Sequence, residues 1–378
     1  MRIDNIFLMK NEIKEYDWGG VSFIPSLLGQ EQDGRPKAEM WLGAHKTFSS
    51  KILIGNQYVP LCDFLEHNRE LLGNGNELSF LFKVLSATKP LSIQIHPSKE
   101  IASRGFKREN DRGININDPC RVYKDENPKI ELVYALSDFY ALKGFLPFIE
   151  IKNIYKNLKL DFSFLDYKEF ISNVFNLQKC EVEDAVGRVR ENLDFLERDR
   201  AYWFNEIYKI YGADVGLLTF LGMHIFKLKP GEVLCTESQE VHAYLKGECL
   251  ELMTNSDNVI RAGLTTKYID KNEMLKVGRF EESKFSLLKG EDIDNFSVFK
   301  LPGTDLMLLR REISEEIYFK RDSAMILLVM DGQIQINDHF FLKRGDSIFV
   351  GACDERLLIR GNGEIFIALS DEKLFKPL

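Results

Sequence analysis

The feature that most constrains the fold is a change, between residues 147 and 211, in the content of Gly and Pro and in the spacing of apolar residues. This stretch contains almost no Gly or Pro, and its apolar residues recur at a spacing near 3.6, the period of an amphipathic helix. The residues on either side form short apolar runs separated by Gly, Pro, Asn and Asp, which is typical of strands joined by turns. The sequence therefore predicts a mainly β protein with a helical insertion.

The chain is long enough for several packed units. Its 378 residues exceed the size at which one hydrophobic core usually stops growing. We expect a β domain whose first part is 1–146, a helical insertion domain at 147–211, the second part of the β domain at 212–285, and a C-terminal β domain at 286–378. Alternating apolar runs and Gly or Asp turns predict that the two β units are jelly rolls or β-sandwiches.

Composition excludes some classes of partner. The formal net charge of -8 disfavours nucleic acid, because phosphate backbones are bound through clustered Lys and Arg. Charges interrupt the short apolar run near the N-terminus, unlike a secretory signal, and no stretch approaches the roughly 20 apolar residues of a membrane helix. Six cysteines without CxxC spacing argue against a disulfide scaffold or a thiolate zinc site. We expect a cytoplasmic protein that does not bind membranes.

The segment SATKPLSIQIHPSKE predicts a strand with one polar face. Side chains alternate along a strand, so Ser92, Gln94 and His96 point one way while the apolar residues between them point the other. That face could simply meet solvent. Inside a β-barrel it would line a cavity with an imidazole and an amide oxygen, both able to bind a metal.

A second segment, RVYKDENPKIELVYAL, places Lys129 and Glu131 on one face of a strand that is otherwise apolar. An ion pair at the solvated end of a strand is the simpler interpretation. A buried functional pair is the alternative.

The richest segment is ESQEVHAYLKGECLELMTNSDNVIRAGLTTK. It predicts a strand that carries His242, a turn centred on Gly247, and a return strand on which Glu251 lies among apolar neighbours. After a further turn at Ser-Asp-Asn, Arg261 and Lys267 bring positive charge to the region of the carboxylates.

These segments resemble the type I phosphomannose isomerase family. The likeness rests on IQIHP, KIELVYAL and HAYLKGECLELMTNSDNVIRAGLTTK, and also on EYDWGG and AEMWLGAH, and it extends over nearly the whole chain. It implies two cupin-like β units and an aldose–ketose isomerase that interconverts mannose 6-phosphate and fructose 6-phosphate through an enediol. The C-terminal unit, around GDSIFVGA, carries no second metal set and is expected to be structural.

The resemblance also implies a metal site. The family's zinc ligands fall on Gln94, His96, Glu131 and His242, and each position holds the expected residue type. Four protein ligands leave a position open for water or a substrate oxygen, which is a feature of catalytic zinc sites. One zinc ion is therefore the expected cofactor.

Further roles follow from the same resemblance. Arg261 matches the family's essential arginine, Lys129 its active-site lysine, and Lys83 and Ser92 the positions that contact the substrate phosphate. Lys267 closes the GLTxK motif. Guanidinium and ammonium groups are suited to a sugar phosphate or to the negative charge of an enediolate.

Two motifs depart from the family pattern, and the acid and the base therefore have two candidates each. HKPE is replaced by Pro128-Lys129-Ile130-Glu131, and GLTPK contains Thr266. Without the histidine, Asp257 or Lys129 is the candidate for opening the sugar ring. Glu251 or Asp257 is the candidate for the base that moves the carbon 2 proton.

Two other functions are compatible with the pattern. A non-catalytic sugar-phosphate sensor could retain the pocket while losing turnover, as the loss of the histidine at Pro128 would allow. An iron dioxygenase of the cupin type would need a face of two histidines and one carboxylate, and Gln94 as a fourth ligand argues against it. We expect the chain to act as a monomer on a small sugar phosphate.

Overall fold

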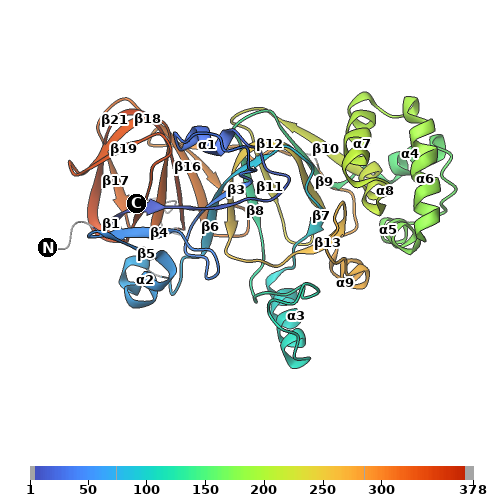
Figure 1. Ribbon diagram of the computed structural model, residues 1–378, viewed down its shortest axis with the longest axis horizontal. Helices are drawn as coiled ribbons and strands as arrows, with labels where there is room; N and C mark the ends of the chain where they lie inside the picture. The colour runs from blue at the N-terminus through green and yellow to red at the C-terminus, as the bar shows by residue number, and fades with distance from the viewer. Residues whose placement is uncertain (1–4, 74, 285, 371–378) are drawn as a thin grey trace.

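The computed structural model describes residues 5–73, 75–284 and 286–370. Two large sheets lie side by side, and a cluster of helices packs at the far end of one of them (Figure 1). The expected class, mainly β with a helical domain, is confirmed.

The first sheet contains ten strands and is organised around the long strand β12 (His242–Thr254). β12 pairs antiparallel with four other strands, two along each part of its length. The remaining strands are β2 (Glu12–Lys14), β3 (Glu39–Leu42), β6 (Phe80–Ala87), β7 (Ile93–Ile95), β8 (Glu131–Ala135), β9 (Phe139–Phe145), β10 (Met223–Leu228), β11 (Val233–Thr236) and β13 (Ile260–Gly263).

The turn that we expected at Gly247 is wrong, because β12 continues through this residue. The strand carries an irregularity between Tyr244 and Lys246, and Gly247 has a φ of 124°. A Cβ at Gly247 would lie 2.7 Å from the carbonyl oxygen of Asp138, so only glycine fits the bend. An extra residue in a strand exchanges the faces of the residues that follow it. Glu251 thereby reaches the same side of the sheet as Tyr244.

The second sheet contains eleven strands and combines both ends of the chain. The expected domains assign 1–146 to the first β unit, but β1, β4 and β5 pair within the sheet of the C-terminal unit. Its strands are β1 (Ile6–Lys10), β4 (Lys51–Ile54), β5 (Gln57–Pro60), β14 (Glu291–Ile293), β15 (Phe296–Lys300), β16 (Leu306–Ile313), β17 (Ile317–Arg321), β18 (Met325–Ile336), β19 (Phe340–Lys343), β20 (Ser347–Val350) and β21 (Cys353–Ser370).

The helical insertion is longer than the expected 147–211, because α8 (Val215–Leu221) follows where we expected the β texture to return. Its run VGLLTFL is too short and too apolar to show a period. The Asp214 side chain accepts from the Gly216 amide and caps the helix. The earlier helices are α4 (Phe148–Asn157), α5 (Tyr167–Asn176), α6 (Lys179–Glu191), the 3-10 turn η2 (Leu193–Phe195) and α7 (Arg198–Tyr211).

Other helical segments lie between strands. They are α1 (Phe23–Leu27), α2 (Leu61–His67), η1 (Arg69–Leu72), α3 (Lys99–Asp111), which projects from one edge in Figure 1, and α9 (Lys271–Val277). Within the described ranges, no helix has both the length and the apolar character needed to cross a membrane.

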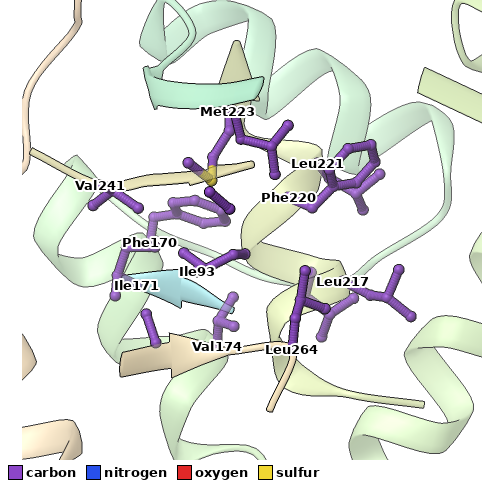
Figure 2. Packing of buried hydrophobic residues seen from close by; sticks show 14 of the residues in the cluster. Ile93, Phe170, Ile171, Val174, Leu217, Phe220, Leu221, Met223, Val241 and Leu264 are labelled. Carbon is purple, nitrogen blue, oxygen red and sulfur yellow. The ribbon is translucent and has the colours of Figure 1, made fainter. Parts of the chain in front are cut away.

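The insertion packs behind the short strand β7. Figure 2 shows Ile93 of β7 among Phe170 and Val174 of α5 and Leu217 and Phe220 of α8, and all of these side chains are almost completely buried. Since neighbouring residues of a strand face opposite ways, the side chain between Ile93 and Ile95 points away from the helices.

Candidate metal centre and active site

Gln94 lies at the middle of β7 and faces away from the helical insertion. In the strand register it is directly opposite His242 of β12 on one side and Arg261 of β13 on the other. Residues directly opposite each other on neighbouring strands point to the same face. Three of the expected site residues are thus brought together by strand pairing.

His96, Glu131 and His242 form a compact buried cluster, with one ligand atom from each lying within 4.8 Å of the others. His96 Nε2 is 3.3 Å from Glu131 Oε1, and His242 Nε2 is 3.4 Å from Glu131 Oε2. The amide nitrogen of Gln94 lies 3.5 Å from His242 Nε2. The structure therefore brings together all four residues of the expected metal set.

The outer ring nitrogens of both histidines are held by backbone carbonyls. His96 Nδ1 is 2.7 Å from the oxygen of Asn258, and His242 Nδ1 is 2.9 Å from that of Glu240. A carbonyl can only accept, so each Nδ1 carries the hydrogen and each Nε2 presents a lone pair to the cluster. Carbonyl partners of this kind fix the tautomer of metal-binding histidines.

The environment of His96 suits a metal ion. Its Nε2 is buried and makes no hydrogen bond to any described residue, although buried polar atoms are normally satisfied. Burial, reinforced by the charge of Lys129, lowers the pKa of His96 to about 3. The ring is therefore neutral at physiological pH, as a metal ligand must be.

Lys129 and Glu131 are buried, so the surface ion pair that we considered is wrong. Lys129 Nζ lies 2.9 Å from Glu131 Oε1. Burial alone would raise the pKa of Glu131, but Lys129 and the two histidines outweigh it and hold the pKa well below its usual range. The carboxylate is thus charged and ready to bind a cation.

Glu251 belongs to an internal network beside this cluster. Tyr244 Oη is 2.9 Å from Glu251 Oε1 and 3.1 Å from Glu131 Oε2, and Lys83 Nζ donates to Glu251 Oε2 at 2.9 Å. Burial raises the pKa of Glu251, although Lys83 opposes the shift. Only 3% of the Glu251 side chain is exposed, so it is shielded from any substrate.

Asp257 lies in the connection between β12 and β13, and 41% of its side chain is exposed. Its Oδ2 is 3.0 Å from His45 Nε2. Asp125 accepts from the amide of Asp257 at 2.8 Å and from the hydroxyl of Ser256 at 2.9 Å, which holds the turn. We did not single out His45 from the sequence, although it belongs to the segment AEMWLGAH.

Positive charge borders the site at Arg261 and Lys267. Arg261 is partly exposed and, among the described residues, its guanidinium has no hydrogen bond or ion pair; burial lowers its pKa. Lys267 is exposed, and its Nζ lies 5.6 Å from the ring centre of Tyr16. Ser92 precedes β7, which is shorter than we expected, and the structure places no hydrogen bond between Ser92 and the other site residues.

Comparison with known proteins gives a consistent result. Residues 6–148 match the family model for the catalytic domain of type I phosphomannose isomerase. Mannose-6-phosphate isomerase of Shigella flexneri is 33% identical over 383 residues, which cover 94% of this chain and 97% of that protein. The Homo sapiens mannose-6-phosphate isomerase is 29% identical over 412 residues, which cover 93% and 95%.

Solved structures agree with the sequence comparisons. A zinc-bound mannose 6-phosphate isomerase has a TM-score of 0.90 and 31% identity, covering 97% of this chain and 100% of that one. A mutant phosphomannose isomerase from Salmonella typhimurium has a TM-score of 0.91 and 31% identity, covering 97% and 99%.

Proposed function

The chain belongs to the type I phosphomannose isomerase family, and we propose that it is a zinc-dependent enzyme interconverting D-mannose 6-phosphate and D-fructose 6-phosphate. One observation carries the proposal: a cluster of two histidines, a carboxylate and an amide lies on the same face as an arginine without a carboxylate partner among the described residues. Metal ligands beside an uncompensated positive charge suit an anionic sugar.

Gln94, His96, Glu131 and His242 would hold one zinc ion. The lone pairs of both Nε2 atoms and the ionised carboxylate already face one point, and rotation of the Gln94 amide would present its oxygen there. When bound, zinc would polarise a substrate oxygen as a Lewis acid. With four protein ligands, that oxygen would take a fifth position, to which zinc can expand.

Positive side chains would recognise the charged parts of the substrate. We assign Arg261 to the negative charge of the enediolate, because a fixed charge beside developing charge stabilises the transition state most. Lys267, Lys83 and Ser92 are proposed to contact the phosphate. Of the two lysines, Lys267 has the more accessible charge, because Lys83 is buried and paired with Glu251.

Asp257 is our proposed base in preference to Glu251. Its carboxylate is accessible and has a lowered pKa, whereas Glu251 is enclosed and has a raised pKa. Asp257 would remove the proton from carbon 2 while the bonding pair forms the carbon 1–carbon 2 double bond and the carbonyl pair moves to oxygen 1, whose negative charge Arg261 would stabilise. A proton then passes from oxygen 2 to oxygen 1, and the same carboxyl returns its proton to carbon 1 as oxygen 2 becomes the ketone oxygen.

Ring opening needs another proton transfer, which Pro128 cannot perform. Asp257 and Lys129 are our candidates, because each offers a titratable group beside the metal cluster. A positioned acid or base at such a step contributes about 10²–10⁴ in rate.

The decisive test is formation of fructose 6-phosphate from mannose 6-phosphate, measured in a coupled assay. Purified protein is assayed as isolated, after chelation, and after zinc is added back. We expect turnover to disappear with the chelator and to return with zinc. Binding of mannose 6-phosphate to zinc-loaded protein without turnover would instead support the sugar-phosphate sensor. A cytoplasmic location and a monomeric state remain predictions.

A further inference from the structure

His45 and Asp257 come from distant parts of the chain and meet at the edge of the site. His45 lies between β3 and β4, and its Nε2 is 3.0 Å from Asp257 Oδ2. His45 is buried at 8% exposure, whereas 41% of the Asp257 side chain is exposed. The imidazole therefore stands behind a carboxylate that a substrate could reach.

The ring of His45 is fixed in both position and tautomer. Trp41 contacts it edge to face, with ring centres 5.1 Å apart. The backbone amide of Thr47 donates to His45 Nδ1 at 3.4 Å, and the Thr47 hydroxyl lies 3.1 Å from the same atom. An amide can only donate, so Nδ1 is an acceptor and Nε2 carries the hydrogen. His45 Nε2 thus donates to Asp257.

We propose that His45 is a positioning residue that orients the Asp257 carboxylate, so that it can accept the carbon 2 proton of the substrate. This inference rests on the proposed isomerase function. It concerns His45, which does not belong to the metal set and is not itself required to touch the sugar.

The charges around Asp257 support this role. Burial alone would raise the pKa of Asp257, but the hydrogen bond from His45 and the charges of Lys129 and Lys83 outweigh it and lower the pKa. The other charged or titratable groups that act on this carboxylate, or on which it acts, are Lys14, Tyr16, Lys124 and Asp125. His45 is the group that adds a directed hydrogen bond from its side chain.

Two matched substitutions separate the directed bond from mere packing. The amide of His45→Gln can reach the place of Nε2 and donate to Asp257, whereas the shorter amide of His45→Asn falls near the place of Nδ1. In zinc-loaded protein we expect His45→Asn to lower kcat at least about tenfold, with little change in KM. The acid limb of its kcat/KM profile should move to higher pH, because the pKa of Asp257 rises. His45→Gln should lose less and shift less.

A double substitution shows whether His45 acts through Asp257. In an Asp257→Asn background, His45→Asn should cause little additional loss, since residues that act as a unit are not additive. Equal losses for His45→Asn and His45→Gln with an unmoved pH profile, or a double variant that multiplies the two single losses, would overturn the inference. Zinc content and circular dichroism check that each variant is folded.

If His45→Asn does not fold, the tautomer of His45 in wild-type protein can be measured instead. Nitrogen-15 NMR of the imidazole should show hydrogen on Nε2 and not on Nδ1, and the opposite tautomer would overturn the inference. An inactive zinc-loaded wild type would overturn the proposed function, whereas an active wild type with the wrong tautomer would overturn the role of His45 alone.

Discussion

Arg261 lies opposite Gln94, and its guanidinium makes no ion pair with a carboxylate in the described part of the chain. We expect Arg261→Ala to lower kcat/KM by about 10²–10³, the usual effect of removing a group that stabilises developing charge. Zinc content should be unchanged, because arginine is not a ligand. Exposed Arg35, which is paired with Asp33, is the control. Near-normal turnover in Arg261→Ala would remove this role.

His96 makes the stability of metal-free protein depend on pH. Its pKa falls from 6.5 to about 3 on folding, so between these values the unfolded chain binds a proton that the folded chain does not. The free energy of unfolding of the metal-free protein is therefore highest above pH 6.5, where neither state binds this proton, and it declines as pH falls toward 3. Urea midpoints of chelated protein should decline over that range, and less steeply in His96→Gln. An exposed control, His67→Gln, should keep the wild-type slope.

At the scale of elements, the bend in β12 decides which side chains share the site. Gly247→Ala adds a Cβ 2.7 Å from the carbonyl oxygen of Asp138, at a φ of 124°. We expect it to reduce the free energy of unfolding by at least about 2 kcal/mol and to weaken the Tyr244–Glu251 contact. Gly303→Ala is the matched control, because its φ is also positive but its Cβ meets nothing within 4 Å. Equal losses in the urea unfolding of both variants would show that the close contact is unimportant.

The bend at Gly247 could not be predicted from the sequence. Glycine after a run of strand-forming residues predicts a turn as readily as a bend, since both use a positive φ. The four proposed ligand positions could be named from the sequence because the segments resemble a known family and the residue types match. His45 could not, because its partner Asp257 is far away in sequence and only the folded sheets bring the two together.

At the scale of the molecule, the helical insertion supports the metal centre from behind. Leu217 of α8 is fully buried in the cluster that covers Ile93 of β7. We expect Leu217→Ala to cost about 2–5 kcal/mol in urea unfolding, as for other buried leucines. Leu165→Ala is the control, because Leu165 is 80% exposed and should change stability by less than about 0.5 kcal/mol. Similar losses for both would mean that the insertion packs loosely.

The class of fold was predictable over the whole chain, but the sharing of strands between sheets was not. The spacing of apolar residues distinguishes strands from helices, because the two have different periods. It does not identify the partner of a strand, which depends on long-range pairing. Phe7 and Phe349 are neighbours in the second sheet, and no local pattern around either of them indicates this.

The pairing of β1 with β20 has a consequence for synthesis. Leu8 is opposite Ile348, so about 340 residues must be translated before the N-terminal strand meets this partner. At roughly 5–20 residues per second, the edge of β1 that pairs with β20 stays unpaired for between about 17 and 70 seconds. The C-terminal unit cannot close while the ribosome is still making β20. Nascent chains that stall before this point would carry β1 with one edge unpaired, even where its other edge has met β4, and such open edges are prone to aggregation.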